Sequence, residues 1–389
     1  MTISRNLSVL ASNVSSSGII STPLLTTPIV NSATTLSLQT NGSTTAVTID
    51  ASQIISLTNA LPVTSGGTGN ITGATNYTGF KNRIINGAMV IDQRNAGASV
   101  SLIAAPFTLD RWAGQVLTGG GVQRITSPIA GFTNSLKYPA TASNAFLQMG
   151  QQIEYTNCYD LQNTTVAISF WAKANNTNAG STALVVRTRT GAGVDSIVRF
   201  AGTNVDTSVT ITTSAVQYTV TRTLPATFGA LSLEFALGAN VSGDGFEITG
   251  VQLEKGSTAT SFDYRPYGTE LSLCQRYLPA FTNTVSGTYT ISNAGGIVTT
   301  TTARITIPFQ VATRVPPTGL TTTAPSGFFL YNGSQINQSP TAVTLAAPGI
   351  YQSEITATFP AISAAGQGQF TCFWFQTLGA QLLFTGCEL

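Results

Sequence analysis

The chain has 389 residues, of which 42% are hydrophobic and only 8% are charged, and its formal net charge is +2. This length is sufficient for two or three domains that each have a core, and the hydrophobic share excludes an intrinsically disordered composition. Because no block of basic residues is present to neutralise phosphates, nucleic acid is not the expected partner.

Membrane insertion, secretion and several kinds of catalysis are also disfavoured. No apolar run approaches the roughly 18 residues that span a bilayer, so we expect no membrane insertion. Residues 1–18 lack the continuous apolar segment of a signal peptide, which indicates assembly in a cytosol. The sequence contains no histidine, which excludes Ser-His-Asp and Cys-His catalysis and removes the commonest metal ligand. We expect no cofactor.

The N-terminal part is predicted to form an anchor and a shaft. Residues 1–25 mix Ser, Asn and apolar residues, and we interpret them as an anchor that becomes ordered where it docks. Residues 26–78 contain short alternating bursts, such as Leu36 and Leu38, that predict strands. Isolated hairpins of this kind are marginal in water, but wound around two other copies each could bury an apolar face. Within this shaft, Gly66–Gly69 predicts a turn with positive φ.

Residues 79–268 are predicted to form a β-sandwich. In the strand Val166–Ala174, strict alternation places Ile168 and Phe170 on one face and Trp171 on the other. A further strand follows at Val251–Glu254. A turn-rich segment with Gly256, Pro266 and Gly268 ends this strand and precedes a short predicted helix, Glu270–Tyr277. We expect Thr269 to cap this helix, with Leu271 and Cys274 on one side.

Residues 269–389 begin with this helix and continue as a second all-β unit, the tip. Its short strands are separated by Gly, Pro and Asn turns at the spacing of a sandwich. The run Phe370–Phe375 (FTCFWF) is too apolar for a solvated edge, so it must lie in a core or between protomers. The overall prediction is an all-β protein, with an anchor and a fibrous shaft followed by two jelly-roll-like β-sandwich domains.

The four cysteines are expected to be reduced and structural. They form no CxxC pair and have no metal-ligand spacing, and a free thiol packs as a small apolar side chain. They are Cys158, Cys274, Cys372 and Cys387. The alternative is a disulfide between Cys372 and Cys387.

Carboxylates are few, and those that could act as a catalytic pair have structural explanations. Glycoside hydrolysis needs two carboxylates about 5 to 10 Å apart, and the candidates are Asp110, Asp244, Glu247, Glu254 and Asp263. Asp110 beside Arg111 is interpreted as an ion pair, and Asp244 between glycines as a turn residue. We therefore expect no enzyme. A structural calcium ion held by Asp244, Glu247 and backbone carbonyls is an alternative role.

Aromatic side chains are the candidates for glycan binding, because a flat ring buries the apolar face of a pyranose. In the sandwich they are Trp112, Trp171 and Tyr218, and near the tip they are Tyr289, Phe328, Phe329 and Tyr331. The alternative for each is a core or interface role. The best candidate is the segment Pro316–Gln338, interpreted as a loop. In the competing interpretation it contains a strand with Phe329 and Tyr331 on one face and Phe328 on the other.

Three arginines could instead recognise an acidic polysaccharide. Arg187 and Arg189 have the spacing of one strand face, and Arg199 could share that face with them. The alternative is that they neutralise the few acids of the chain or line a contact between protomers.

Several strings resemble tail-fibre and appendage proteins of bacteriophages that infect aquatic bacteria. Along the chain they keep the order expected from such proteins. The strings are FKNRIINGAMVIDQRNAG, FTLDRWAG, VAISFWAKA, SAVQYTVTRTLPA, GDGFEITGVQLEKG and VQLEKGSTATSFDYRPYGTELSLCQRYL. The resemblance covers about half the chain and implies a sandwich similar to carbohydrate-binding modules.

The resemblance also implies a function and partners. It implies a homotrimeric virion structural protein that attaches to host surface polysaccharide and contacts other tail or capsid proteins through its N-terminus. The alternative is a capsid-bound fibre or tail adaptor whose sandwich binds virion proteins and no sugar. A depolymerase tailspike is disfavoured because long β-helix repeats and a credible acid pair are missing.

Overall fold

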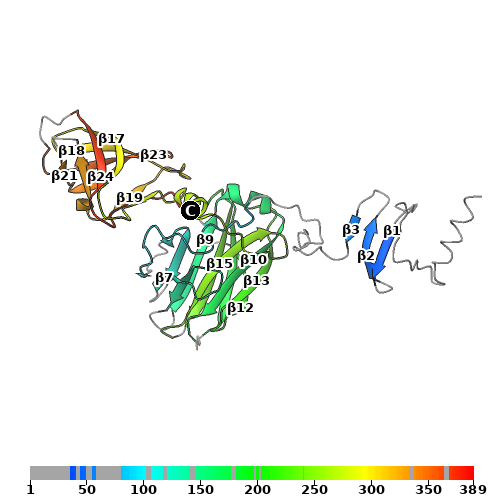
Figure 1. Ribbon diagram of the computed structural model, residues 1–389. Coiled ribbons are helices and arrows are strands. Elements are labelled where there is room, and N and C mark those ends of the chain that lie inside the picture. The colour runs from blue at the N-terminus through cyan, green and yellow to red at the C-terminus, as the bar shows by residue number, and fades with distance from the viewer. Residues whose placement is uncertain are drawn as a thin grey trace, which may run out of the picture. The chain divides into compact units, whose positions relative to one another are not determined.

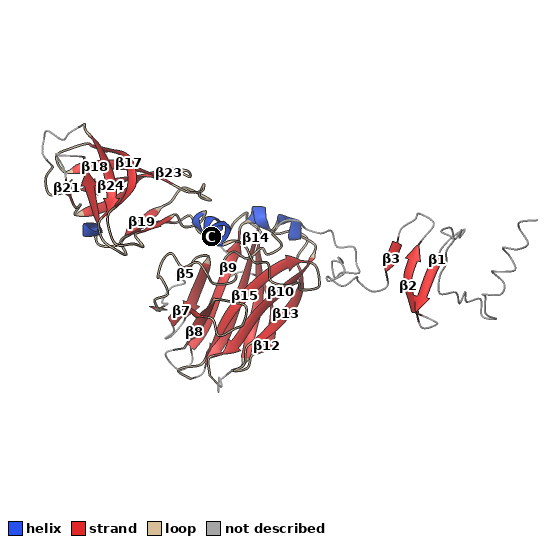
Figure 2. Ribbon diagram, in the orientation of Figure 1, coloured by secondary structure: helices blue, strands red, loops and turns tan. Residues whose placement is uncertain are grey.

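The computed structural model describes residues 36–40, 44–49, 55–57 and 80–389, apart from the short segments 102–106, 117–120, 141–144, 177–180, 197–198, 201–202, 240, 333–336 and 363–367. The chain divides into two compact units, Met1–Thr78 and Gly79–Leu389. Strands dominate the described residues (Figures 1 and 2), so the expected all-β class is confirmed.

The first unit contains a small antiparallel sheet. Its strands are β1 (Leu36–Thr40), β2 (Thr44–Ile49) and β3 (Ile55–Leu57), in the order β1-β2-β3. The alternating bursts therefore form strands, as expected. The anchor at 1–25 and the glycine turn at 66–69 lie outside the described residues.

The sandwich consists of two six-stranded antiparallel sheets with the orders β13-β10-β15-β8-β7-β4 and β12-β11-β14-β9-β6-β5. Its strands are β4 (Val100–Ser101), β5 (Phe107–Leu109), β6 (Trp112–Val116), β7 (Gly121–Thr126), β8 (Asn134–Pro139), β9 (Ala145–Ile153), β10 (Thr165–Ala174), β11 (Ala183–Gly191), β12 (Thr203–Thr210), β13 (Val216–Thr223), β14 (Ala230–Ala239) and β15 (Gly245–Lys255). Two 3₁₀ turns, Tyr155–Asn157 and Tyr159–Leu161, precede β10.

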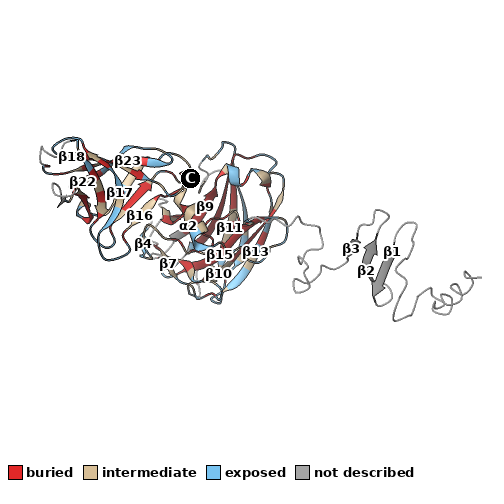
Figure 3. Cartoon of the chain, turned by 45° about the horizontal axis from the view of Figure 1, so that its top comes forward, coloured by how far each residue is buried: buried red, intermediate tan, exposed pale blue. Residues whose placement is uncertain are grey.

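The inner faces of these sheets form one apolar core. The Phe170 and Phe235 rings meet edge to face with centroids 4.8 Å apart, and both side chains are fully buried. Burying a side chain of this size contributes roughly 1.5–3 kcal/mol. Figure 3 shows how buried residues run along the strands of the sandwich. The predicted alternation in β10 is confirmed, because Ile168 and Phe170 are buried whereas Trp171 on the opposite face is half-buried.

A bulge in β15 lies opposite Phe170 and requires glycine. The register between β10 and β15 shifts between Ser169 and Trp171, and Gly250 there has φ +61°. A Cβ atom at Gly250 would lie 2.4 Å from the Phe132 ring. The bulge therefore allows an aromatic ring to rest directly on the backbone of β15.

The helix α2 (Tyr267–Gln275) connects the sandwich to the tip. The predicted helix is confirmed but its cap is not, because Pro266 occupies the N-cap position without a side-chain cap. Thr269 lies inside the helix, since the fixed φ of proline already starts the first turn. Cys274 packs in a small cluster with Tyr277 and Leu389.

Glu154 ties the sandwich to the segment after α2. Its carboxylate accepts hydrogen bonds from Arg276 Nη2 and from Tyr277 Oη, each at 2.7 Å. Burial by itself raises the pKa of Glu154, but the bonds and charge of Arg276 and the Tyr277 bond outweigh it and hold the pKa below its ordinary 4.5. The charged form of Glu154 is therefore favoured in the folded state.

Glu154→Gln is expected to make stability less dependent on pH. A depressed carboxyl pKa contributes stability that is present above pH 4.5 and is lost as the pH falls through the folded-state value. The difference in urea midpoint between the parent and the variant should therefore shrink below pH 4.5. A constant difference across this range would contradict the assignment.

The tip consists of a seven-stranded sheet, β21-β20-β24-β17-β18-β23-β22, and a three-stranded sheet, β16-β25-β19. Its strands are β16 (Ala280–Thr282), β17 (Tyr289–Ile297), β18 (Thr302–Pro308), β19 (Gly319–Thr322), β20 (Phe328–Tyr331), β21 (Asn337–Gln338), β22 (Ala342–Ala347), β23 (Gln352–Thr358), β24 (Phe370–Phe375) and β25 (Gln381–Thr385). A 3₁₀ turn, Pro325–Gly327, precedes β20.

The tip has a core of its own within a single chain. Ile305, Phe328, Phe373 and Phe384 are each 0% exposed and belong to one cluster. The tip therefore buries these side chains without a second copy of the chain. The run Phe370–Phe375 splits by alternation, with Phe373 inward and Phe370 88% exposed.

Two smaller expectations concern cysteines and membranes. All four cysteines are free, so the alternative Cys372–Cys387 disulfide is not formed. Burial raises the pKa of the Cys158 thiol to about 12, which favours the inert protonated form. No helix in the described part of the chain is long and apolar enough to cross a membrane.

Candidate functional site

The three sandwich aromatics singled out from the sequence do not form one surface. Trp112 is 0% exposed, and its indole Nε1 donates to the Asn86 carbonyl at 3.0 Å, so its ring is not accessible to a glycan. Tyr218 stacks on the core residue Phe170 with centroids 5.6 Å apart. Trp171 lies on the opposite face of β10, so only this ring is presented outward.

The segment Pro316–Gln338 is not a single loop, since it contains β19, a 3₁₀ turn and β20. The competing interpretation is confirmed. Phe328 stacks on Phe373 in the core, with ring centroids 5.4 Å apart and planes at 11°, whereas Tyr331 is half-buried on the other face. Phe328 is therefore a core residue and is not accessible as a glycan platform.

On the outer face of the seven-stranded sheet, two of the candidate residues meet a third ring. Phe329 in β20 pairs with Trp374 in β24, and their ring centroids are 5.5 Å apart. Tyr331 lies 5.3 Å from the same indole ring. These three residues, the aromatic triad, pack together on one face of the adjacent strands β20 and β24, where Phe329 is only 8% exposed and Tyr331 and Trp374 are half-buried.

Trp374 was not among the sequence candidates, although a signal for it existed. Alternation within Phe370–Phe375 places Phe370, Cys372 and Trp374 on one face. The Nε1 atom of Trp374 is buried and has no hydrogen-bond partner among the described residues. An unpaired buried N–H is costly, so an acceptor from a ligand would stabilise it.

An open groove lies beside the triad. Thr290 of β17 pairs with Trp374, and β17 pairs with β18 only at Gly295–Ile297, so the two strands separate toward Thr290. The resulting groove has a volume of about 550 Å³. Its lining carries hydroxyl and amide side chains and no charge: Thr290, Ile291, Ser292, Asn293, Ala294, Thr306, Pro308 and Gln352. Tyr289, which precedes the groove, is 45% exposed.

The candidate carboxylates occupy separate structural positions. Asp110 accepts bonds from the Gln93 backbone nitrogen at 2.7 Å and from Gln93 Nε2 at 2.6 Å, and the expected ion pair with Arg111 is not formed. Burial raises the pKa of Asp110 above its ordinary value. Arg111 instead lies over the Tyr277 ring at 3.6 Å.

Of the remaining carboxylates, Glu247 faces Lys173 at 3.9 Å, and Glu254 accepts bonds from Gln252 and Thr260. Asp244 lies in the turn before β15, as expected. Among the described residues, no three His, Cys, Asp or Glu side chains are grouped to hold a metal ion.

Arg187 and Arg189 neutralise acids, as the alternative interpretation stated. Arg187 forms two bonds of 2.7 Å with Asp206, and Arg189 Nε donates to Glu234 at 2.8 Å. Both lie on one face of β11, as predicted, although Arg189 is buried there. Arg199 lies outside the strands, with its guanidinium 4.5 Å from the centre of the Phe107 ring.

Comparisons with known proteins give structural neighbours but no family. No family model matches the sequence, and no curated protein matches it. The enzymatically active domain of bacteriophage CBA120 tailspike protein 4 aligns with a TM-score of 0.29 and 14% identity, covering 45% of this chain and 21% of that chain.

Carbohydrate-binding modules are also among the neighbours. TmCBM61, solved with β-1,4-galactotriose, aligns with a TM-score of 0.29 and 11% identity, covering 45% of this chain and 99% of that one. The family 11 module of the Clostridium thermocellum cellulase Lic26A-Cel5E has a TM-score of 0.27 and 14% identity, covering 42% and 99%.

Proposed function

We propose that this chain is a non-enzymatic virion fibre protein that attaches to neutral glycans on the host cell surface through its tip. The observation that carries the proposal is the aromatic triad beside an uncharged groove. The half-buried Tyr331 and Trp374 of the triad offer ring faces for a pyranose, with Phe329 packed beneath them, and groove residues such as Asn293 and Gln352 offer hydrogen bonds to its hydroxyls. Pockets with apolar walls and a few polar groups are the usual form of ligand sites.

The groove favours a neutral polysaccharide over an acidic one. Its side chains are all uncharged, whereas Arg187 and Arg189 are already paired with acids elsewhere in the chain. The indole N–H of Trp374 adds a donor for a ring or hydroxyl oxygen. An extended glycan chain would cross the triad and continue along the groove.

The proposal includes assembly as a homotrimer inside the host cytoplasm, with residues 1–25 docking on other virion proteins. Its support is the sequence resemblance together with the short strands β1–β3, which form only a small sheet in one chain. Sedimentation velocity on the purified chain separates a trimer from a monomer.

The second candidate function is a capsid-bound fibre or tail adaptor that binds virion proteins and no sugar. Phe370 favours it, because this ring is 88% exposed on the same face as Trp374. Exposed aromatic rings of this kind are typical of protein interfaces.

Tyr331→Ala and Trp374→Ala are each expected to weaken glycan binding at least about tenfold, which corresponds to ~1.4 kcal/mol. The loss follows from removal of a stacking face, while unfolding should change by no more than about 1 kcal/mol because neither ring lies in the core. The measurement is binding of the purified chain to an array of neutral and acidic polysaccharides.

Tyr351→Ala is the matched control, since this tyrosine of the tip is 69% exposed outside the groove lining. It should bind as the parent does. Equal binding by all variants would reject the triad as the glycan site. An array on which the parent binds no polysaccharide would favour the adaptor function.

A further inference from the structure

A second pocket lies in the sandwich and is built from segments that are distant in the sequence. Its volume is about 180 Å³. The lining comes from residues 82–90, the turn 131–133, the segment 262–265 and Glu270 of α2. None of the aromatic candidates from the sequence takes part in it.

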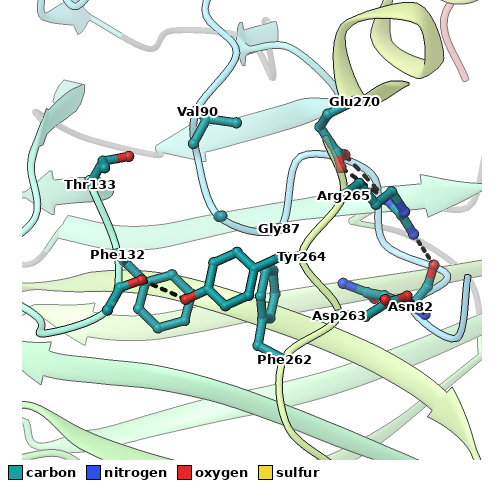
Figure 4. A pocket seen from close by; sticks show the side chains of 12 residues that line it. Asn82, Gly87, Val90, Phe132, Thr133, Phe262, Asp263, Tyr264, Arg265 and Glu270 are labelled. Carbon is teal, nitrogen blue, oxygen red and sulfur yellow. Dashed lines mark hydrogen bonds and ion pairs between the residues drawn. The ribbon is translucent and has the colours of Figure 1, made fainter. Parts of the chain in front are cut away.

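Three aromatic rings form one wall of this pocket. Phe262 meets Phe132 with centroids 5.3 Å apart and Tyr264 with centroids 4.8 Å apart, both edge to face. Phe132 rests on the bulge at Gly250. Figure 4 shows the rings together on one side and the Arg265–Glu270 pair on the other. The wall is fixed by the fold before any ligand arrives.

Small residues opposite the rings leave the space open. Gly87 and Ala88 line the pocket, and a Cβ atom at Gly87 would lie 2.1 Å from the Val251 carbonyl oxygen. The backbone at Gly87 therefore approaches β15 so closely that only glycine fits. The pocket therefore has backbone and the small side chain of Ala88 on this side, facing the aromatic wall.

Two polar groups of the lining have unused hydrogen-bonding capacity. Asp263 Oδ2 accepts from the backbone nitrogens of Lys81 and Asn82, at 2.8 and 3.2 Å, whereas its Oδ1 accepts no bond from the described residues. Arg265 is only 3% exposed at its side chain, and its Nε has no partner in the described part of the chain. A ligand with adjacent donors and acceptors would satisfy both.

Charge and size restrict the ligand further. The lining holds two carboxylates, Asp263 and Glu270, and one guanidinium, Arg265, which together sum to −1. An acidic ligand would be repelled by this excess. The volume of about 180 Å³ is below the roughly 300–1,000 Å³ of sites for drug-sized molecules, so the pocket holds one ring.

We propose that this pocket binds a single neutral sugar residue, which stacks on Phe132, Phe262 and Tyr264 and hydrogen-bonds to Asp263 and Arg265. A pyranose supplies an apolar face of C–H groups for the rings, together with hydroxyls that both donate and accept. The proposal is independent of the glycan site at the tip. It gives the sandwich a ligand site that also contacts α2 through Glu270.

The test is titration of the full chain with methyl glycosides of glucose, galactose and mannose and with glucuronate, followed by saturation-transfer NMR. A ligand with so few atoms should bind with a Kd on the order of 1 mM. Tyr264→Ala should weaken the preferred neutral glycoside at least about fivefold. Tyr159→Ala is the matched control, because both tyrosines are 58% exposed, and it should bind as the parent does.

A second variant tests the charge argument. Asp263→Asn retains an oxygen that can accept the backbone bonds but removes the charge, so it should weaken the neutral glycoside and reduce discrimination against glucuronate. The same titration in Tyr331→Ala/Trp374→Ala separates the two sites, since pocket binding should persist there. Absence of binding by every neutral glycoside, or binding that Tyr264→Ala leaves unchanged, would overturn the proposal.

Discussion

Trp112→Ala is expected to lower the free energy of unfolding by about 3–5 kcal/mol, the range for deleting a buried aromatic side chain. Trp112 is 0% exposed and packs against Phe235 with centroids 6.5 Å apart. The substitution would leave a large cavity and would also remove the donor to the Asn86 carbonyl. The measurement is urea unfolding followed by circular dichroism.

Trp171→Ala is the control for this experiment, since the same side chain is removed from the outer face of β10. It should cost about 1 kcal/mol. Equal costs for the two tryptophans would contradict the assignment of Trp112 to the core. If the costs differ as expected, a glycan-binding defect that only Trp112→Ala causes is explained by unfolding and not by the loss of a binding residue.

Glu234→Gln has the second large expected effect, a loss of about 3–5 kcal/mol of unfolding free energy. Glu234 is 0% exposed and accepts bonds from Arg189 Nε at 2.8 Å, Gln148 Nε2 at 2.7 Å and the Phe200 nitrogen at 2.7 Å. The substitution removes one partner of a buried ion pair, which is strongly destabilising. It also places a donor among four donors, since Ser232 Oγ donates to Glu234 as well, at 3.1 Å.

The matched control is Glu354→Gln in the tip. Glu354 also pairs with an arginine, Arg304, but the side chain of Arg304 is 51% exposed. Exposed pairs of this kind contribute about 0–1 kcal/mol. Thermal unfolding of both variants at low and high salt provides the comparison, and a cost at Glu234 as small as that at Glu354 would show that the buried pair is dispensable.

Alternation in the sequence predicted which side chains share a face but not what covers that face. It placed Phe329 and Tyr331 opposite Phe328, because successive side chains of a strand point to opposite sides. The nature of each face depends on the sheet that packs against it. Trp112 could therefore not be assigned to the core from its own segment.

Part of the tip site was predictable and part was not. Phe329 and Tyr331 were candidates from residue type alone. Trp374 joins them because β20 pairs with β24, and the groove opens because β17 leaves β18 after three paired positions. Register between strands that are far apart in the chain is a property of the whole sheet, and no local pattern contained it.

What the sequence by itself determined is the all-β class, the strand faces and the helix after the sandwich. These follow from short-range periodicity, breaker residues and residue chemistry. Only the tertiary structure decided the start of that helix at Pro266, the partner of Arg189 and the pocket at Tyr264. Arg189 and its partner Glu234 are 45 residues apart in the sequence, and the lining of the pocket includes residues as distant in the sequence as Asn82 and Glu270. The physical reason is that burial and hydrogen-bond partners depend on which distant segments meet, and that is settled when the sheets pack.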